Sequence, residues 1–177
     1  DWSSDVCSSD LPTPPTAREL DAQFPGIFDG AMLLAGGANI ILQLALPGVG
    51  YGVAESRVES GSILHHPIKR SRTTFTYVAV AMMGTSEEKL AYRRAVNRSH
   101  AQVHSTEHSP VKYNAFDENL QMWVAACLYW GFVDTHQKLH GPMSQQEKET
   151  FYQLAHPLGT TLQVRQDTWP KDLQAFD

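Results

Sequence analysis

The sequence is poor in cysteine and has no excess of basic residues. It holds two cysteines, Cys7 and Cys127, and a formal net charge of -5 from 14 Lys and Arg against 19 Asp and Glu. Cys7 lies in the N-terminal segment 1–11, and one remaining thiol forms neither a disulfide nor a thiolate metal site. Cys127 is therefore expected to pack in a core. The negative charge balance predicts no nucleic-acid binding, because a phosphate backbone attracts basic surfaces.

The two ends of the chain differ in sequence character from the middle. Residues 1–11 resemble the in-frame translation of a common sequencing-adapter oligonucleotide, so we expect this segment to be disordered and to lie outside the fold. Residues 12–23 begin with three prolines in four positions and are expected to form an extended lead-in. Residues 24–177 remain as a single domain, expected to be incomplete because neither Gly nor Pro follows the last apolar residues.

Charge is also absent from Ala31 to Ala54, so a membrane span has to be weighed there. Pro47-Gly48 divides this stretch, and Ala31–Leu46 has the length of a buried core helix, which is the interpretation we favour. Residues 47–50 are then expected to form a turn or a tight backbone approach. With 42% hydrophobic and 19% charged residues, the chain is too apolar to be disordered.

What the sequence has is a series of helix signals. Pro67 and Gly84 are typical of a helix's first position and of the residue after its end, and they predict a helix over Pro67–Met83 despite its β-branched interior. Residues 85–88 form a capping box for a second helix, which should carry Tyr92, Val96, His100 and Val103 on one stripe.

Asp117 is a plausible N-cap for a third helix. Its apolar residues recur at helical spacing on every side, so we expect this helix to be buried nearly all round, until Gly141-Pro142 ends it. Residues 144–147 form another capping box, which predicts a helix through Ala155. The pattern predicts an all-α protein.

Three polar residues lie on these largely apolar stretches. They belong to an ordered set: R-x-x-x-T at Arg70 and Thr74, N-R-S-H-A-Q-V around His100, and Y-N-A-F-D-E-N-L-Q-M-W-V from Tyr113 to Val124. This set resembles the haem-dependent oxygenase family that includes the MpaB enzymes and the rubber oxygenases (latex-clearing proteins). The resemblance covers roughly Phe24 to Asp177. It makes residues 24–177 a partial helical oxygenase catalytic domain.

The resemblance implies a multi-helix bundle that encloses a haem pocket. It also implies haem b with its iron as the cofactor, and O2 as a reactant. The substrate would be a small, apolar, isoprenoid-like molecule in which a carbon–carbon double bond is cleaved or otherwise oxidised.

The resemblance also assigns candidate site residues. His100 matches the axial ligand of the haem iron, because an imidazole in an apolar stripe with no adjacent acid suits such a ligand. Arg70 would bind a haem propionate through its planar fork, and Thr74 would place a hydroxyl near the distal side. Glu55 resembles the acidic residue near the distal pocket, where it could act as a base. Thr73 stands where rubber oxygenases have a lysine, so a distal lysine role cannot be carried over.

Two other readings stay open. His100 and His104 are four residues apart and could bind zinc in a metal-dependent hydrolase, although Ala101 stands where the H-E-x-x-H pattern has its glutamate. Alternatively, the chain is a non-catalytic helical module in which Arg70 is a surface residue and Thr74 bonds to its own helix. Membrane association stays open, although no segment of this sequence encodes it. A cytoplasmic or peripheral membrane location is favoured, although the true N-terminus is missing.

Overall fold

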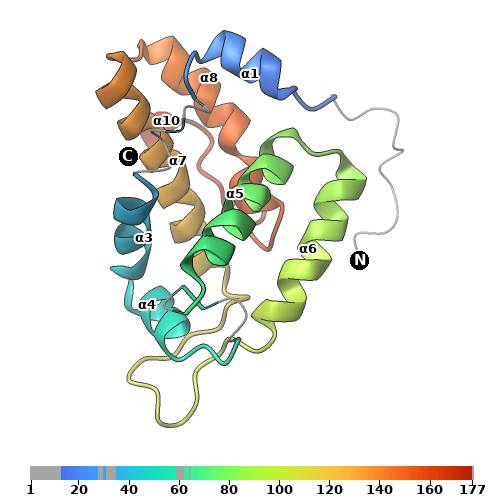
Figure 1. The fold of residues 1–177 in the computed structure, drawn as a ribbon, viewed down its shortest axis with the longest axis vertical. Coiled ribbons are helices and arrows are strands. Elements are labelled where there is room, and N and C mark those ends of the chain that lie inside the picture. Colours follow the sequence, from blue (N-terminus) through green and yellow to red (C-terminus); the bar gives the residue numbers. More distant parts are fainter. Residues whose placement is uncertain (1–12, 28–29, 31–34, 59–61, 64, 177) are drawn as a thin grey trace.

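The structure is a computed structural model and consists of helices joined by loops (Figure 1). Within the described part of the chain the only β-type pairing is an isolated antiparallel bridge between His104 and Asn114. The all-α prediction is confirmed. The prediction for residues 1–11 falls outside the described residues, which are 13–27, 30, 35–58, 62–63 and 65–176.

The helices keep the labels of Figure 1. They are α1 (Ala17–Gln23), α3 (Gly36–Leu44), α4 (Pro47–Ala54), α5 (Pro67–Met83), α6 (Ser86–His100), α7 (Glu118–His140), α8 (Gln145–Ala155), α9 (Pro157–Thr160) and α10 (Leu173–Phe176).

Capping boxes begin three of these helices. Those at Thr85 and Ser144 were predicted. In both, the cap hydroxyl accepts a hydrogen bond from the third helical N–H, and the glutamate carboxylate accepts one from the N-cap backbone N–H. A third box pairs Thr16 with Glu19 and begins α1, where an extended lead-in was expected. The prolines before Thr16 suggested an extended chain, but the local capping pattern prevails for Ala17–Gln23.

The predicted helix Pro67–Met83 is confirmed with the same bounds. Its threonines fit because their hydroxyls donate back to carbonyls one turn earlier, as Thr74 Oγ1 does to the Arg70 carbonyl at 3.0 Å. The following helix, α6, stops at His100. Val103 therefore does not belong to the predicted helical stripe of Tyr92, Val96 and His100.

Two expectations for the uncharged stretch were wrong. Residues 47–50 are not a turn but the first half of α4, with Pro47 at the helix start. The alternative expectation of a close approach holds at Gly48, where a methyl group would lie 2.9 Å from the Leu120 side chain. No residue of α3 is buried, and Ile41 is 72% exposed, so the described part of this stretch is not a core helix. Among the described residues no single helix is long and apolar enough to cross a membrane; α3 and α4 pass by length and composition only as a pair bent by 107°.

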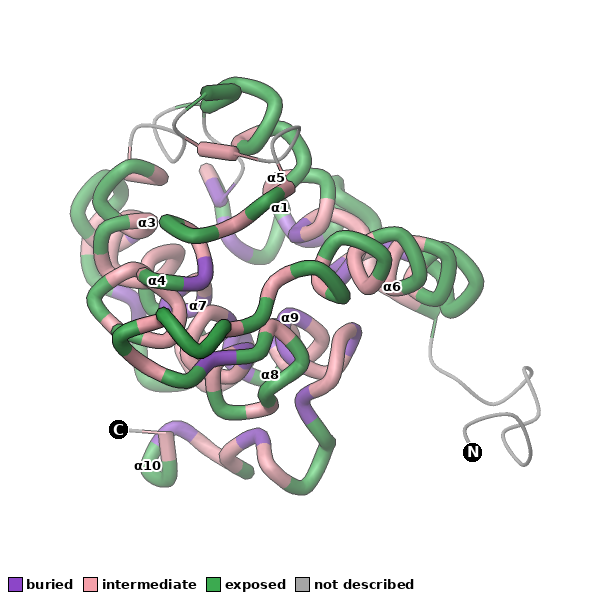
Figure 2. The backbone as a smooth tube through the Cα atoms, turned by 90° about the horizontal axis from the view of Figure 1, so that it is seen from below, coloured by how far each residue is buried: buried purple, intermediate pink, exposed green. Residues whose placement is uncertain are grey.

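The core gathers around α7 and α8. Buried residues of α1, α5, α8, α9 and the C-terminal segment form one hydrophobic cluster with Ala125 and Tyr129 of α7, and Figure 2 shows the buried segments in purple. Phe151 and Tyr152 of α8 are 1% and 0% exposed. The aromatic rings of Tyr129, Tyr152 and Phe176 meet edge to face at 5.1–5.3 Å.

Helix α7 is less buried than predicted, because its surface is shared between the core and α3. Cys127 and Tyr129 are 3% exposed, but Trp130 is 51% exposed. Gly131 allows α3 to approach closely, since a methyl group there would overlap the Asn39 amide. Asn39 donates to the Cys127 carbonyl at 2.6 Å, so this contact joins the two helices by a hydrogen bond as well. As predicted, α7 ends before Gly141, whose φ is +98°.

Candidate functional site

His100 is the last residue of α6, and its imidazole faces protein on several sides. Its Nδ1 atom is buried and has no hydrogen-bond partner among the residues that the structure describes. The Phe116 ring lies edge-on to the imidazole, with ring centroids 6.3 Å apart. Burial and, to a smaller extent, the charge of Arg70 together lower the pKa of His100 to about 4. The ring is therefore neutral at pH 7 and offers one ring nitrogen that the protein leaves unsatisfied.

Arg70 lies on the first turn of α5, close enough to His100 for its charge to lower that pKa. Its side chain keeps a large accessible surface, yet surrounding protein atoms lower its own pKa by desolvation, while Tyr92 opposes the shift. The guanidinium has no ion pair among the described residues.

Helices α5 and α6 lie side by side and bring these residues together (Figure 1). The Tyr92 hydroxyl of α6 donates to the Thr73 carbonyl of α5 at 2.9 Å. Thr74 is four residues from Arg70, as the predicted shared face requires, but its hydroxyl is already bonded to the Arg70 carbonyl. The structure therefore groups Arg70, Tyr92 and His100, with Thr74 beside Arg70.

Glu55 is the C-cap of α4 and makes a different set of contacts. Its carboxylate accepts hydrogen bonds from Ser109 at 2.6 Å and from Tyr113 at 2.7 Å. These bonds lower the pKa of Glu55, with Ser109 contributing more than Tyr113. The carboxylate is thus ionised at neutral pH and holds the loop that follows His100.

Two cavities flank these residues. One, of about 470 Å3, is lined by the start of α5 and the residues before it: His65, His66, Pro67, Ile68, Lys69 and Arg72. The other, of about 240 Å3, lies between Glu55 and the loop 102–113. Neither cavity is lined by His100 or Arg70.

The zinc reading requires His100 and His104 to share a helical face. They do not, because α6 ends at His100 and His104 lies in the antiparallel bridge with Asn114. In the part of the chain that the structure describes, no three His, Cys, Asp or Glu side chains are grouped so that they could hold a metal ion. A haem iron needs only one such ligand from the protein.

Sequence reasoning missed the polar side chains that support His100. Asn97 lies three residues before His100 and thus on the same helical face, a signal that was available. Gln121 and Gln163 gave no local signal, because their bond to one another joins residues 42 positions apart. Phe116 lies within the segment that carried the resemblance, but its contact with His100 depends on the course of the loop.

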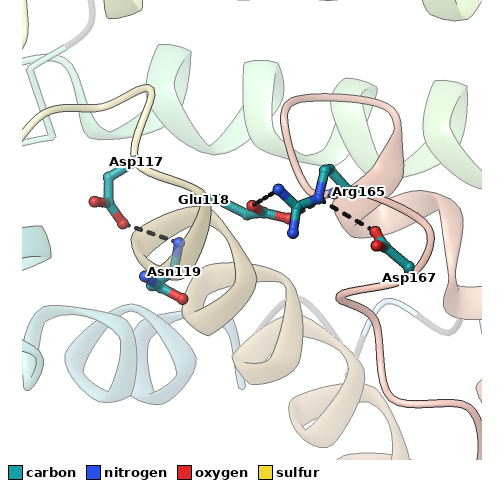
Figure 3. A network of polar contacts seen from close by, with 5 residues as sticks. All are labelled: Asp117, Glu118, Asn119, Arg165 and Asp167. Atoms are coloured by element: carbon teal, nitrogen blue, oxygen red, sulfur yellow. Dashed lines mark hydrogen bonds and ion pairs between the residues drawn. The ribbon is translucent and has the colours of Figure 1, made fainter.

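The start of α7 is held firmly by charge and capping (Figure 3). The Asp117 side chain accepts from the Asn119 and Leu120 N–H groups, which confirms the predicted N-cap. Glu118 accepts from the backbone N–H of Arg165 at 2.9 Å, and the Arg165 guanidinium lies 3.7 Å from the same carboxylate. Arg165 also pairs with Asp167. The loop 161–168 is therefore tied to the first turn of α7.

The fold and the site define an all-α protein in which a histidine with an unpartnered ring nitrogen lies near an arginine that forms no ion pair among the described residues. The comparison with known families is more specific: residues 27–177 match the family described as ER-bound oxygenase mpaB/B'/Rubber oxygenase, catalytic domain. Because the match covers most of the sequence, the chain belongs to this oxygenase family.

Two curated relatives are similar to this chain. They are uncharacterized protein Rv2237 of Mycobacterium tuberculosis (strain ATCC 25618 / H37Rv) and uncharacterized protein Mb2261 of Mycobacterium bovis (strain ATCC BAA-935 / AF2122/97). Each is 56% identical over 145 residues, which is 82% of this chain and 57% of the relative. The chain thus spans a little over half the length of these relatives. No solved structure matches the chain significantly.

Proposed function

We propose that this chain is part of a haem b-dependent oxygenase that acts with O2 on a small, apolar, isoprenoid-like substrate. Membership of the oxygenase family supports the reaction class. The proposed cofactor is supported mainly by one observation, the buried, unpartnered Nδ1 atom of His100 near Arg70. When bound, haem supplies the activation of O2 at its iron, while the protein supplies binding and orientation.

The residues present fit such a group. An imidazole that burial keeps neutral is the form that binds iron, since a protonated ring has no free lone pair. A buried ring nitrogen without a partner costs roughly 1–3 kcal/mol, and this cost is removed when the imidazole gains a ligand or an acceptor. His100 would hold the iron through one nitrogen.

Arg70 supplies the complementary charge. Haem carries two propionates, and an arginine fork binds a carboxylate through two parallel hydrogen bonds. Arg70 is accessible and has no carboxylate of its own among the described residues, so its donors are available. The effect of its charge on His100 supports a role for both residues at the same bound group.

The roles of Glu55 and Thr74 are proposed separately. Glu55 would act as a base, and the deprotonated state that Ser109 and Tyr113 stabilise is the state a base needs. The same two bonds weaken its basicity, so a substrate would have to displace one of them. Thr74 would turn its hydroxyl from the Arg70 carbonyl toward the distal side.

The test compares two histidines in the whole protein expressed from its gene. His100→Ala is expected to lose most of its haem, measured by the Soret absorbance per protein, because it removes the axial ligand. His104→Ala is the matched control and should retain haem, because its ring nitrogen Nδ1 faces only the Ser105 carbonyl. Equal haem content in the two variants would overturn the assignment of His100.

The same absorbance spectrum separates this proposal from its alternatives. Wild-type protein with bound zinc, hydrolytic activity and no Soret band would favour the metal-dependent hydrolase. Wild-type protein that binds neither haem nor metal would favour the non-catalytic module.

A further inference from the structure

A chain of side-chain amides connects the two sides of the His100 site. Gln121 and Gln163 bond to each other twice: Gln121 Nε2 donates to Gln163 Oε1 at 2.6 Å, and the Gln163 backbone N–H donates to Gln121 Oε1 at 2.9 Å. From this pair one bond runs to Asn97 Oδ1 at 3.0 Å and another to the Ala115 carbonyl at 2.7 Å.

Both ends of this chain lie next to His100. Asn97 is on α6 one turn before His100 and on the same face. Ala115 precedes Phe116, whose ring packs edge-on against the His100 imidazole. The two glutamines therefore connect the helical turn that carries the imidazole to the segment that packs against its ring.

Apolar packing does not fix this end of α6. Helix α6 has no buried residue, and in Figure 2 it lies at the edge of the molecule with mostly exposed and intermediate colouring. Non-directional contacts of half-buried side chains leave a helix end free to rotate or slide. Directional hydrogen bonds, which weaken steeply with misalignment, define one position.

The centre of this chain of amides is buried, and its polar atoms have hydrogen-bond partners. Gln121 is 8% exposed, and both its amide nitrogen and its amide oxygen are used. Any movement that breaks one of these bonds leaves a buried amide without a partner, so alternative positions are costly. Two residues after Gln163, Arg165 bonds to Glu118 at the start of α7, which ties this part of the loop to α7 (Figure 3).

We infer that Gln121 and Gln163 are positioning residues that set the place of the His100 imidazole through Asn97 and the orientation of its ring through Ala115 and Phe116. This inference rests on the proposed role of His100 as the haem ligand. Neither glutamine touches the ligand itself. The two glutamines act by setting the direction in which the ring nitrogen of His100 points.

The experiment uses Asn97, where two substitutions separate the hydrogen bond from the helix. Asn97→Leu removes the acceptor for Gln163 but is a better helix former than asparagine. Asn97→Asp keeps an acceptor oxygen at the same place. Gln153→Leu on α8 is the matched control, because it removes another glutamine that bonds to a side chain and a carbonyl.

Two readouts are measured in the whole protein. In the haem-loaded form, Asn97→Leu should release haem roughly tenfold faster and change the spin-state pattern of the electron paramagnetic resonance spectrum, because one hydrogen bond is worth about that factor. Asn97→Asp and Gln153→Leu should remain within about twofold of wild type. In the haem-free form, amide hydrogen exchange at Asn97–His100 and at Ala115–Phe116 should accelerate together in Asn97→Leu only.

The outcomes distinguish this inference from the proposed function. If wild type binds no haem, the proposed cofactor fails, and the exchange measurement alone decides whether Gln121 and Gln163 couple the two segments. If wild type binds haem but Asn97→Leu matches Gln153→Leu in haem release, spectrum and exchange, the positioning role is overturned. Acceleration at Asn97–His100 without acceleration at Ala115–Phe116 also overturns it, since the chain of amides would then connect nothing.

Discussion

The aromatic core around α8 and the α5–α6 site differ in how deeply their side chains are buried and in whether their polar groups have partners. In the core, Phe151 and Tyr152 are at most 1% exposed and pack against other rings, and the Tyr152 hydroxyl is satisfied by the Pro170 carbonyl at 2.6 Å. At the site, α6 buries no residue, and the polar groups of His100 and Arg70 are left without partners.

The core also holds an unpartnered polar atom, the Trp169 indole nitrogen, but it lies among rings and carries no charge. The site combines a buried ring nitrogen of His100, which is costly to leave unsatisfied, with the accessible cation of Arg70, which forms no ion pair among the described residues. From this difference we expect the core to determine stability, and the proposed haem would complete the site.

The largest expected effect tests the core side of this comparison. Phe151→Ala should lower the free energy of unfolding by about 3–5 kcal/mol, because it removes a buried ring and leaves a cavity. Phe116→Ala beside His100 should lower it by less than about 1 kcal/mol, since Phe116 is 38% exposed. Urea denaturation of the haem-free protein measures both. Similar losses in the two variants would break the proposed division between core and site.

Local signals were sufficient to predict most of the fold. The bounds of α5 and α8, the N-cap of α7 and its end at Gly141 follow from residues close together in sequence. The glycines of α4 suggested a turn because propensity does not show that Pro47 can begin a helix whose other residues are small. The length of α6 was overestimated because the apolar spacing continues to Val103 although the helix does not.

The candidate site was predictable only in part. Arg70 and His100 were found because the family resemblance marks them, and the structure brings them together. The hydrogen bonds of Glu55 to Ser109 and Tyr113 join residues 54 and 58 positions apart. The Gln121–Gln163 pair likewise depends on the return of the chain after α9. Such contacts are set by tertiary packing, and no local pattern encodes them.

The second prediction uses pH to sharpen the comparison. In the folded, haem-free protein the pKa of His100 is about 4, below the value near 6.5 of an unfolded histidine. The unfolded state therefore binds more protons between these values. The resulting stability is present above pH 6.5 and is lost as the pH falls toward 4, by up to about 3 kcal/mol.

His136 and His156 also have lowered pKa values from burial and contribute in the same direction. The contribution of His100 is therefore the difference between wild type and His100→Leu, measured by urea denaturation at pH 7 and pH 4.5. His100→Leu should lose clearly less stability over this interval. Equal losses would mean that the imidazole is not held neutral by its surroundings.

The last and smallest effect concerns Arg70 and the haem-loaded protein. Arg70→Leu should weaken haem binding by roughly 1.5–3 kcal/mol, because a hydrogen bond between charged groups is lost. Arg70→Lys should weaken it less, since the charge remains although the planar fork does not. Haem transfer to an excess of a competing apoprotein measures both affinities. The core should not respond, because Arg70 keeps a large accessible surface and bonds to no core residue. If Arg70→Leu instead lowers the free energy of unfolding of the haem-free protein by the same amount, Arg70 is a structural residue and the division between core and site does not hold at α5.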